Sequence, residues 1–222
     1  SNSGVFSTNN AAINGSGKAE ALFVGGCVGA QINGDSDGCR YAKNVSTATI
    51  TVDVDVTKEY NLGGVSGIAL GMISDYYNEA KIYAKGKAGN RALVGGIVGR
   101  KNSSRIRNTC INSGDIEASI DALPVLLVGG IAGFTNNVQW DYLGSSNSGS
   151  ISFKQGAPCS GEVAMGGLVG WAFLGNNASI PHRFYGEGYA ENRGNVVFSG
   201  SCGSNVYMGG VVGLAFNDST TT

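Results

Sequence analysis

One short motif, apolar–Gly–Gly–apolar–small–Gly, returns six times and constrains the fold of this chain more than any other feature. Its glycine pairs recur every 32 to 43 residues, at positions 25, 63, 95, 129, 166 and 209. An element with such a period indicates a solenoid, a propeller or another repeat array. We therefore expect residues 1–222 to form a single repeat domain.

A second marker precedes five of the six glycine pairs by 17 to 19 residues, at Asn44, Asn78, Asn112, Asn147 and Asn192. In the last three copies a Gly follows two positions later and a β-branched residue opens the next segment, which is typical of a turn that leads into a strand. The predicted unit is turn, strand, loop, strand. The repeats are then about 8–43, 44–77, 78–111, 112–146, 147–191 and 192–222.

Strand periodicity supports an all-β fold. Residues 47–56 alternate between polar and apolar side chains, residues 115–120 and 150–154 do so more briefly, and no segment has helical periodicity. Alignment of the glycine pairs gives two apolar columns: Val24, Leu62, Val94, Val128, Met165 and Met208, and Cys27, Val65, Ile97, Ile131, Leu168 and Val211. Such columns stack in a parallel β-helix-like β-solenoid of about six coils, each roughly 32–43 residues, with strands about 4.8 Å apart. A propeller is the alternative, but its blades of about 40–45 residues exceed several of these repeats.

Composition argues against several function classes. Fifteen Lys and Arg against 16 Asp and Glu give a net charge of -1, so no basic field attracts nucleic acid. No apolar run approaches the roughly 18 residues of a membrane helix, so we expect no membrane insertion. The glycine motifs lack the spacing of a nucleotide-binding loop, and we expect no cofactor. Since the chain starts without Met and ends in a Ser/Thr run, we interpret it as a piece of a longer protein.

Catalytic motifs are missing from the sequence. His182 is the single histidine, neither Gly-x-Ser-x-Gly nor His-Glu-x-x-His occurs, and Asp115, Glu117, Asp121 and Asp141 form no obvious constellation. We expect that the protein is not an enzyme.

Asn33, Asp35 and Asp37 alternate like the first half of a calcium loop. However, Asn44 stands where the bidentate Glu of such a loop belongs, and a plain polar turn is the competing interpretation. Asn14, Asn44, Asn102, Asn177 and Asn217 each begin an Asn-x-Ser sequon, which predicts glycosylation if the source is eukaryotic.

Aromatic side chains mark a candidate ligand surface. Residues 171–189 form the longest segment between a glycine pair and the next Asn, and insertions in repeat proteins often gather on a binding face. Side chains that could stack on sugar rings are Trp140, Tyr142, Trp171, Phe173 and Tyr185. Core packing is the alternative role for these residues. Likewise, the basic stretch Arg100, Lys101, Arg105 and Arg107 predicts a solvated face or, alternatively, an anionic-glycan site.

Five cysteines are present, and two of them occupy equivalent positions. Cys159 and Cys202 each lie seven residues before a glycine pair, so stacked coils would bring them about 5 Å apart, within disulfide range. This bridge would favour an extracellular compartment. Cys27 belongs to a core column, where a free thiol behaves as a small apolar residue.

The six copies resemble the GLUG-motif repeats of bacterial and some protist surface proteins, whose core is Gly–apolar–apolar–Gly as in Gly167-Leu168-Val169-Gly170. Ser66 and Ala132 depart from that pattern. The resemblance implies an extracellular or cell-surface location and a structural or adhesive role, with no catalytic residues to carry over.

Our main functional hypothesis is a non-catalytic extracellular repeat module of a larger cell-surface or secreted protein. Its expected partners are neighbouring repeats or further copies of itself, head to tail in a fibre, and a host protein or glycan. The alternative is a carbohydrate-binding or polysaccharide-cleaving β-solenoid. A flat ice- or mineral-binding face would need a regular Thr or Asp ladder in one column, and the aligned repeats display none.

Overall fold

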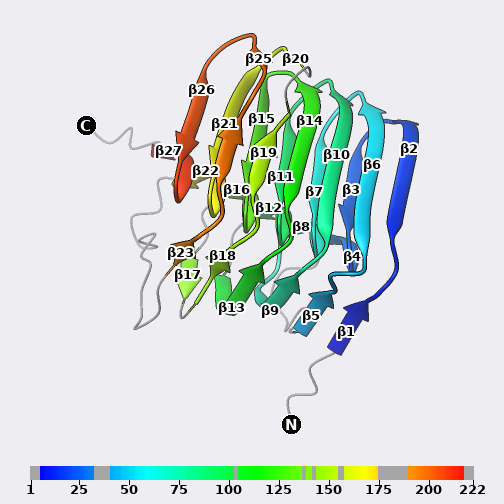
Figure 1. Ribbon diagram of the computed structural model, residues 1–222, viewed down its shortest axis with the longest axis vertical. Coiled ribbons are helices and arrows are strands. Elements are labelled where there is room, and N and C mark those ends of the chain that lie inside the picture. The colour runs from blue at the N-terminus through cyan, green and yellow to red at the C-terminus, as the bar shows by residue number, and fades with distance from the viewer. Residues whose placement is uncertain are drawn as a thin grey trace.

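The computed structural model describes residues 6–32, 41–102, 105–136, 139–141, 144–154, 158–174 and 190–217. Within these residues the regular structure is entirely β, and the paired strands run parallel in stacked sheets. The chain is a β-solenoid, as the repeat period predicts, with the blue N-terminal coil at one end and the red C-terminal coil at the other (Figure 1). The described residues include no helix that is long and apolar enough to cross a membrane.

Each coil contributes one strand to each of four faces, which we number in chain order. Face 1 contains β1 (Phe6–Asn9), β5 (Tyr41–Asn44), β9 (Ile73–Asn78), β13 (Arg105–Asn112), β18 (Ser146–Asn147) and β23 (Glu191–Asn192), with β17 (Gln139–Asp141) paired to β13. Face 2 contains β2 (Ile13–Ala19), β6 (Thr49–Val56), β10 (Lys81–Ala88), β14 (Ile116–Ala122), β19 (Ile151–Phe153) and β24 (Val196–Phe198).

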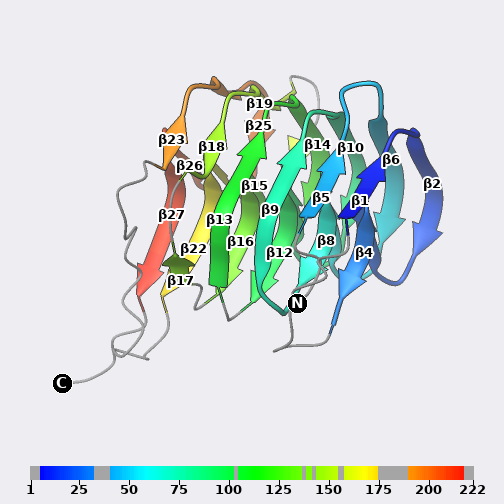
Figure 2. The ribbon, with the colours of Figure 1, turned by 90° about the horizontal axis from the view of Figure 1, so that it is seen from below.

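Face 3 contains β3 (Leu22–Gly25), β7 (Tyr60–Gly63), β11 (Ala92–Gly95), β15 (Val125–Gly129), β21 (Glu162–Gly166) and β26 (Val206–Gly209). Face 4 contains β4 (Val28–Gln31), β8 (Ser66–Ala69), β12 (Val98–Asn102), β16 (Ala132–Asn136), β22 (Val169–Leu174) and β27 (Val212–Asn217). A small sheet pairs β20 (Pro158–Cys159) with β25 (Ser201–Cys202). Figure 2 shows faces 1 and 4 from below.

The predicted unit of two strands per repeat is wrong, because the glycine motif is a corner and not a strand. In the third repeat β11 ends at Gly95 and β12 begins at Val98, so the chain turns between them. A Cβ atom at Gly95 would overlap the carbonyl oxygen of Val98, and one at Gly96 would overlap the carbonyl oxygen of Gly130 on the next coil. The corner is therefore too tight for any side chain.

The predicted register between coils is confirmed. Leu62 pairs with Val24 and Val94, and the same column continues through Val128 and Met165 to Met208. The second column is joined by backbone hydrogen bonds, such as Ile97 N to the oxygen of Ile131 at 3.0 Å. Equivalent residues therefore lie one rung apart, as in-register stacking requires.

Three apolar clusters fill the coil. Faces 2 and 3 pack together through residues such as Ile50 and Leu62, and faces 1 and 4 through residues such as Tyr76 and Val98. A third cluster joins the opposite sides of faces 3 and 4, where Leu127 packs with Phe134. The first two clusters are the main cores of each coil. They meet where the glycine corner contacts the last residue of the face 1 strand.

Asparagines, each the last residue of a face 1 strand, join the coils along this meeting line; the four interior ones are fully buried and the two terminal ones half-buried. The series is Asn9, Asn44, Asn78, Asn112, Asn147 and Asn192, and the Nδ2 of each of the first five donates to the Oδ1 of the next over 2.7 to 3.1 Å. The interior amides also donate to a backbone oxygen, as Asn112 does to Gly114 at 2.9 Å. We call this series the asparagine ladder. The sequence interpretation of these residues as turn formers alone is therefore incomplete.

Candidate functional site

The outward side of face 2 is the first candidate site, and we call the outward side chains of β2, β6, β10 and β14 the charged face. Successive residues of a strand point to opposite sides of the sheet. In β6, Val52, Val54 and Val56 are buried in the core, so Asp53 and Asp55 point outward. The alternating sequence of residues 49–56 thus builds a core on one side and a polar surface on the other.

Neighbouring strands carry opposite charges in two rows of this face: all four members of the first row alternate in charge, and the two central members of the second row do. The first row, in register across four strands, is Lys18, Asp55, Lys87 and Asp121. The second row, two residues earlier in each strand, is Ser16, Asp53, Lys85 and Ser119. Parallel pairing at about 4.8 Å per strand sets the spacing between neighbours within a row.

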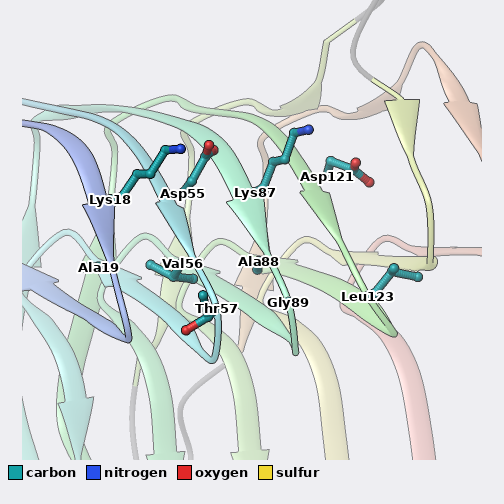
Figure 3. A pocket seen from close by; sticks show the side chains of 10 residues that line it. All are labelled: Lys18, Ala19, Asp55, Val56, Thr57, Lys87, Ala88, Gly89, Asp121 and Leu123. Atoms are coloured by element: carbon teal, nitrogen blue, oxygen red, sulfur yellow. The ribbon is translucent and has the colours of Figure 1, made fainter.

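An open trough of about 500 Å³ lies along the first row, where face 2 turns toward face 3. Its lining includes the first row together with Thr57 and Leu123 (Figure 3). The four charged side chains stand on neighbouring strands and point to the same side in this view. The trough therefore offers both signs of charge to whatever binds there.

The charges beside the trough differ from those at the other end of the face. Lys81 lies 3.6 Å from Asp115, and Lys154 lies 3.0 Å from Glu117. In the described part of the chain, by contrast, Lys18, Asp55 and Lys87 make no ion pair. Asp121 accepts a hydrogen bond from the Ser160 N–H at 2.7 Å, whereas these three side chains are free to meet an external partner.

The C-terminal end of the stack is the second candidate site, and we call it the end surface. Its residues are exposed although their counterparts one coil earlier are buried: Met208 is 48% exposed and Met165 0%, and Val211 is 40% exposed and Leu168 0%. Other exposed apolar residues of the last coil are Val197, Val206 and Phe216. The end surface thus presents core columns and an unpaired strand edge.

The predicted solvated or glycan-binding basic stretch is partly wrong. Arg100 donates to Glu59 at 2.8 Å, and Glu59 also accepts from Arg91 Nε at 2.8 Å. Partial burial acts to raise the pKa of Glu59, but Arg91 and Arg100 outweigh it and hold that pKa below its usual value. Lys101 is fully buried between faces 1 and 4, and burial lowers its pKa to about 7.

The predicted aromatic ligand residues are only partly described. The ring of Trp171 packs edge-on against Phe134, with centroids 5.9 Å apart, and its Nε1 is buried without a hydrogen-bond partner. Phe173 stacks on Phe216 at 5.8 Å. Trp140 lies in β17, and Tyr142 and Tyr185 lie outside the described residues. Trp171 therefore packs against the third apolar cluster, which is the core-packing role that the sequence left open as the alternative.

The metal and glycosylation predictions have different outcomes. Asn33, Asp35 and Asp37 lie outside the described residues, within which no group of His, Cys, Asp or Glu could hold a metal ion. Asn14 is exposed on the charged face and Asn102 is half-buried, whereas Asn177 and the side chain of Asn217 are not described. Glycosylation of Asn44 is contradicted, because its side chain is fully buried in the asparagine ladder.

The predicted cysteine neighbours do lie in register, since Cys159 of β20 pairs with Cys202 of β25. Both are free thiols in this structure, so the predicted disulfide is not formed in it. Burial raises the pKa of the Cys159 thiol, and Cys202 Sγ donates to the Gly161 oxygen at 2.8 Å. The pair remains placed for oxidation.

Sequence reasoning missed the charged rows because the number of residues from the face 2 strand to the glycine pair differs among the repeats. Asp55, Lys87 and Asp121 each lie eight residues before a glycine pair, but Lys18 lies seven before its own. Alignment on the glycines therefore shifts the first coil out of the row. An alignment on the strand pattern of residues 49–56 would have found it.

Comparison of this chain with family models, with curated proteins and with solved structures found no match.

Proposed function

We propose that the chain is a non-catalytic, extracellular structural or adhesive module of a larger cell-surface or secreted protein, and that it associates head to tail through its end surface. The cell-surface setting rests on the resemblance of the six glycine motifs to GLUG repeats. The association rests on the exposure of the last coil. Met208 and Val211 would each regain the burial of their counterparts if one more coil covered them.

The two ends of the stack are chemically matched for such a joint. The first coil carries Val24 and Cys27 in the columns that end at Met208 and Val211. The amide of Asn192 donates to the Gly194 oxygen at 2.8 Å, whereas each interior asparagine also donates to the next coil. A second copy that stacks in register would place Asn9 opposite Asn192 and continue the asparagine ladder.

Gly210 provides a direct test, because it is the one second-position motif glycine at the end of the stack. A Cβ at Gly26, Gly64, Gly96, Gly130 or Gly167 would overlap a glycine oxygen of the following coil, but a Cβ at Gly210 meets nothing within 4 Å. The Gly210→Ala variant should therefore fold normally. Its added methyl group would occupy the space that the first coil of a second copy needs.

The experiment is sedimentation velocity and electron microscopy of the full chain over a wide concentration range. The unsubstituted chain should form rods that lengthen with concentration and that persist at high salt, since the joint is apolar and hydrogen-bonded. Gly210→Ala should retain its circular dichroism spectrum and melting temperature but form no rods. Rods of equal length from both proteins, or an unsubstituted chain that stays monomeric, would contradict the proposal.

The carbohydrate alternative has less support, since the Trp171 ring packs against Phe134. Its remaining candidate is the trough beside Lys18 and Lys87. A glycan array and a reducing-end release assay separate it from the structural module.

A further inference from the structure

We propose that the charged face is a side-by-side dimerisation surface, where the face of one copy pairs with the same face of a second copy. The two-fold axis would run along the strands, midway between β6 and β10. This contact is separate from the end surface, and it does not depend on head-to-tail association.

The first row carries the argument, because its charge order is self-complementary. Rotation about this axis keeps the strand direction but reverses the order of the strands. Lys18 then faces Asp121 of the second copy, and Asp55 faces Lys87 of the second copy. The symmetry repeats each contact, so all four members of the row meet an opposite charge, as an isologous interface requires.

The second row obeys the same symmetry independently. Asp53 faces Lys85 of the second copy, and Ser16 faces Ser119 of the second copy. No like charges meet in either row. Two of the six possible orders of two positive and two negative charges would instead place like charges opposite each other, which electrostatic complementarity disfavours.

Pairing within one sheet is the ordinary explanation for opposite charges on neighbouring strands. The structure gives that explanation to Lys81 with Asp115 and to Lys154 with Glu117. It does not do so for the two rows, because Lys18, Asp53, Asp55, Lys85 and Lys87 make no ion pair among the residues described. Asp121 accepts a hydrogen bond from the Ser160 N–H at 2.7 Å, and the five other charged members of the rows keep their charges available for a second copy.

The dimensions of the face predict a weak contact. Four strands of up to eight residues cover about 19 Å by 26 Å, or roughly 500 Å² on each partner. A standard interface buries about 800 Å² per partner, so a dimer held by this face should form at high concentration and dissociate as salt screens its charges. In a rod, many such faces would act together and strengthen the lateral contact.

A charge exchange across the axis tests the proposal. Asp55→Lys alone puts lysines opposite each other at two symmetry-related places, and Lys87→Asp alone does the same with carboxylates. A mixture of the two variants restores both contacts between unlike chains. The measurement is sedimentation velocity at low and high salt, on full chains that also carry Gly210→Ala to remove the end joint.

We expect the chain with Gly210→Ala alone to dimerise at low salt, and each charge variant to dimerise at least about tenfold more weakly. The equimolar mixture should recover the original dimerisation constant, which a merely structural role of Asp55 or Lys87 cannot produce. A mixture that associates no better than its components, or a parent chain that stays monomeric at low salt, would overturn the proposal. If a charge variant fails to fold, the exchange of Asp53→Lys with Lys85→Asp in the second row gives the same test.

Discussion

Replacement of Asn112 by alanine tests whether the asparagine ladder stabilises the coil stack. The Asn112 side chain is fully buried and makes three hydrogen bonds. Its Nδ2 donates to Asn147 Oδ1 at 2.7 Å and to the Gly114 oxygen at 2.9 Å, and its Oδ1 accepts from Asn78 Nδ2 at 2.7 Å. The amide orientation is fixed, since a flipped amide would turn its oxygen toward the Gly114 oxygen.

The expected loss follows from these bonds. Each contributes roughly 0.5–1.5 kcal/mol net, so their loss costs about 1.5–4.5 kcal/mol of unfolding free energy. Alanine also leaves the Asn147 oxygen without its donor in a buried site, which places the expected value near 3 kcal/mol. Asn112→Asp keeps the size of the side chain but removes both donors and buries a charge, so at neutral pH it should destabilise the protein at least as much.

Asn9→Ala is the matched control. Asn9 also makes three hydrogen bonds: its Nδ2 donates to Asn44 Oδ1 and to the Ala11 oxygen, and its Oδ1 accepts from the Ala11 N–H. Unlike Asn112, it lies at the open N-terminal end of the stack. Water can replace the two exposed bonds to Ala11, so only the bond to the buried Asn44 oxygen is lost and we expect a cost of about 1 kcal/mol. Urea denaturation followed by circular dichroism measures both variants. If Asn112→Ala costs as little as Asn9→Ala, the ladder does not stabilise the stack and the reasoning is wrong.

Three further predictions follow from the same geometry. Gly96→Ala should destabilise the fold by about 3 kcal/mol or more, because its methyl group would overlap backbone of the next coil. Gly210→Ala should change the unfolding free energy by less than about 1 kcal/mol. Urea denaturation of both variants measures the two losses, and equal losses would contradict the prediction. The pKa of Lys101 is about 7 when folded and about 10.4 when unfolded, so the unfolded chain binds more protons between these values and stability should rise by about 2 kcal/mol from pH 7 to 9. Lys101→Met should abolish that rise in denaturation curves, and an unchanged slope would refute the assignment. Mild oxidation should join Cys159 to Cys202, which mass spectrometry of proteolytic peptides detects, and thiols that stay reduced would remove the predicted bridge.

Much of the fold could be predicted from the sequence because the repeated motif reports on contacts between coils. Every motif glycine except Gly210 faces backbone of an adjacent coil or of its own coil, so only glycine fits, and the period becomes visible in the chain. Val94 and its equivalents are apolar for the same reason, since each touches its counterpart. The four-strand coil was less predictable, because strands of four residues such as β7 and β8 are too short to show alternation.

The candidate surfaces depended on information that the linear sequence does not display. Neither the exposure of Met208 nor the burial of Lys101 follows from residue type, because each depends on what the neighbouring coil or face supplies. The charged rows depend on the pairing of four distant strands, where one residue fewer in the first coil displaces Lys18 from any simple alignment.

By itself, then, the sequence determined that six like segments stack in register, since glycines and apolar residues recur wherever one coil touches the next. The tertiary structure alone decided which side chains meet across that stack: the asparagines in a buried ladder, and lysines and aspartates in alternating outward rows. The physical reason is that stacking is enforced locally, at every coil, whereas a hydrogen-bonded ladder or a charge pattern exists only once separate coils share a register.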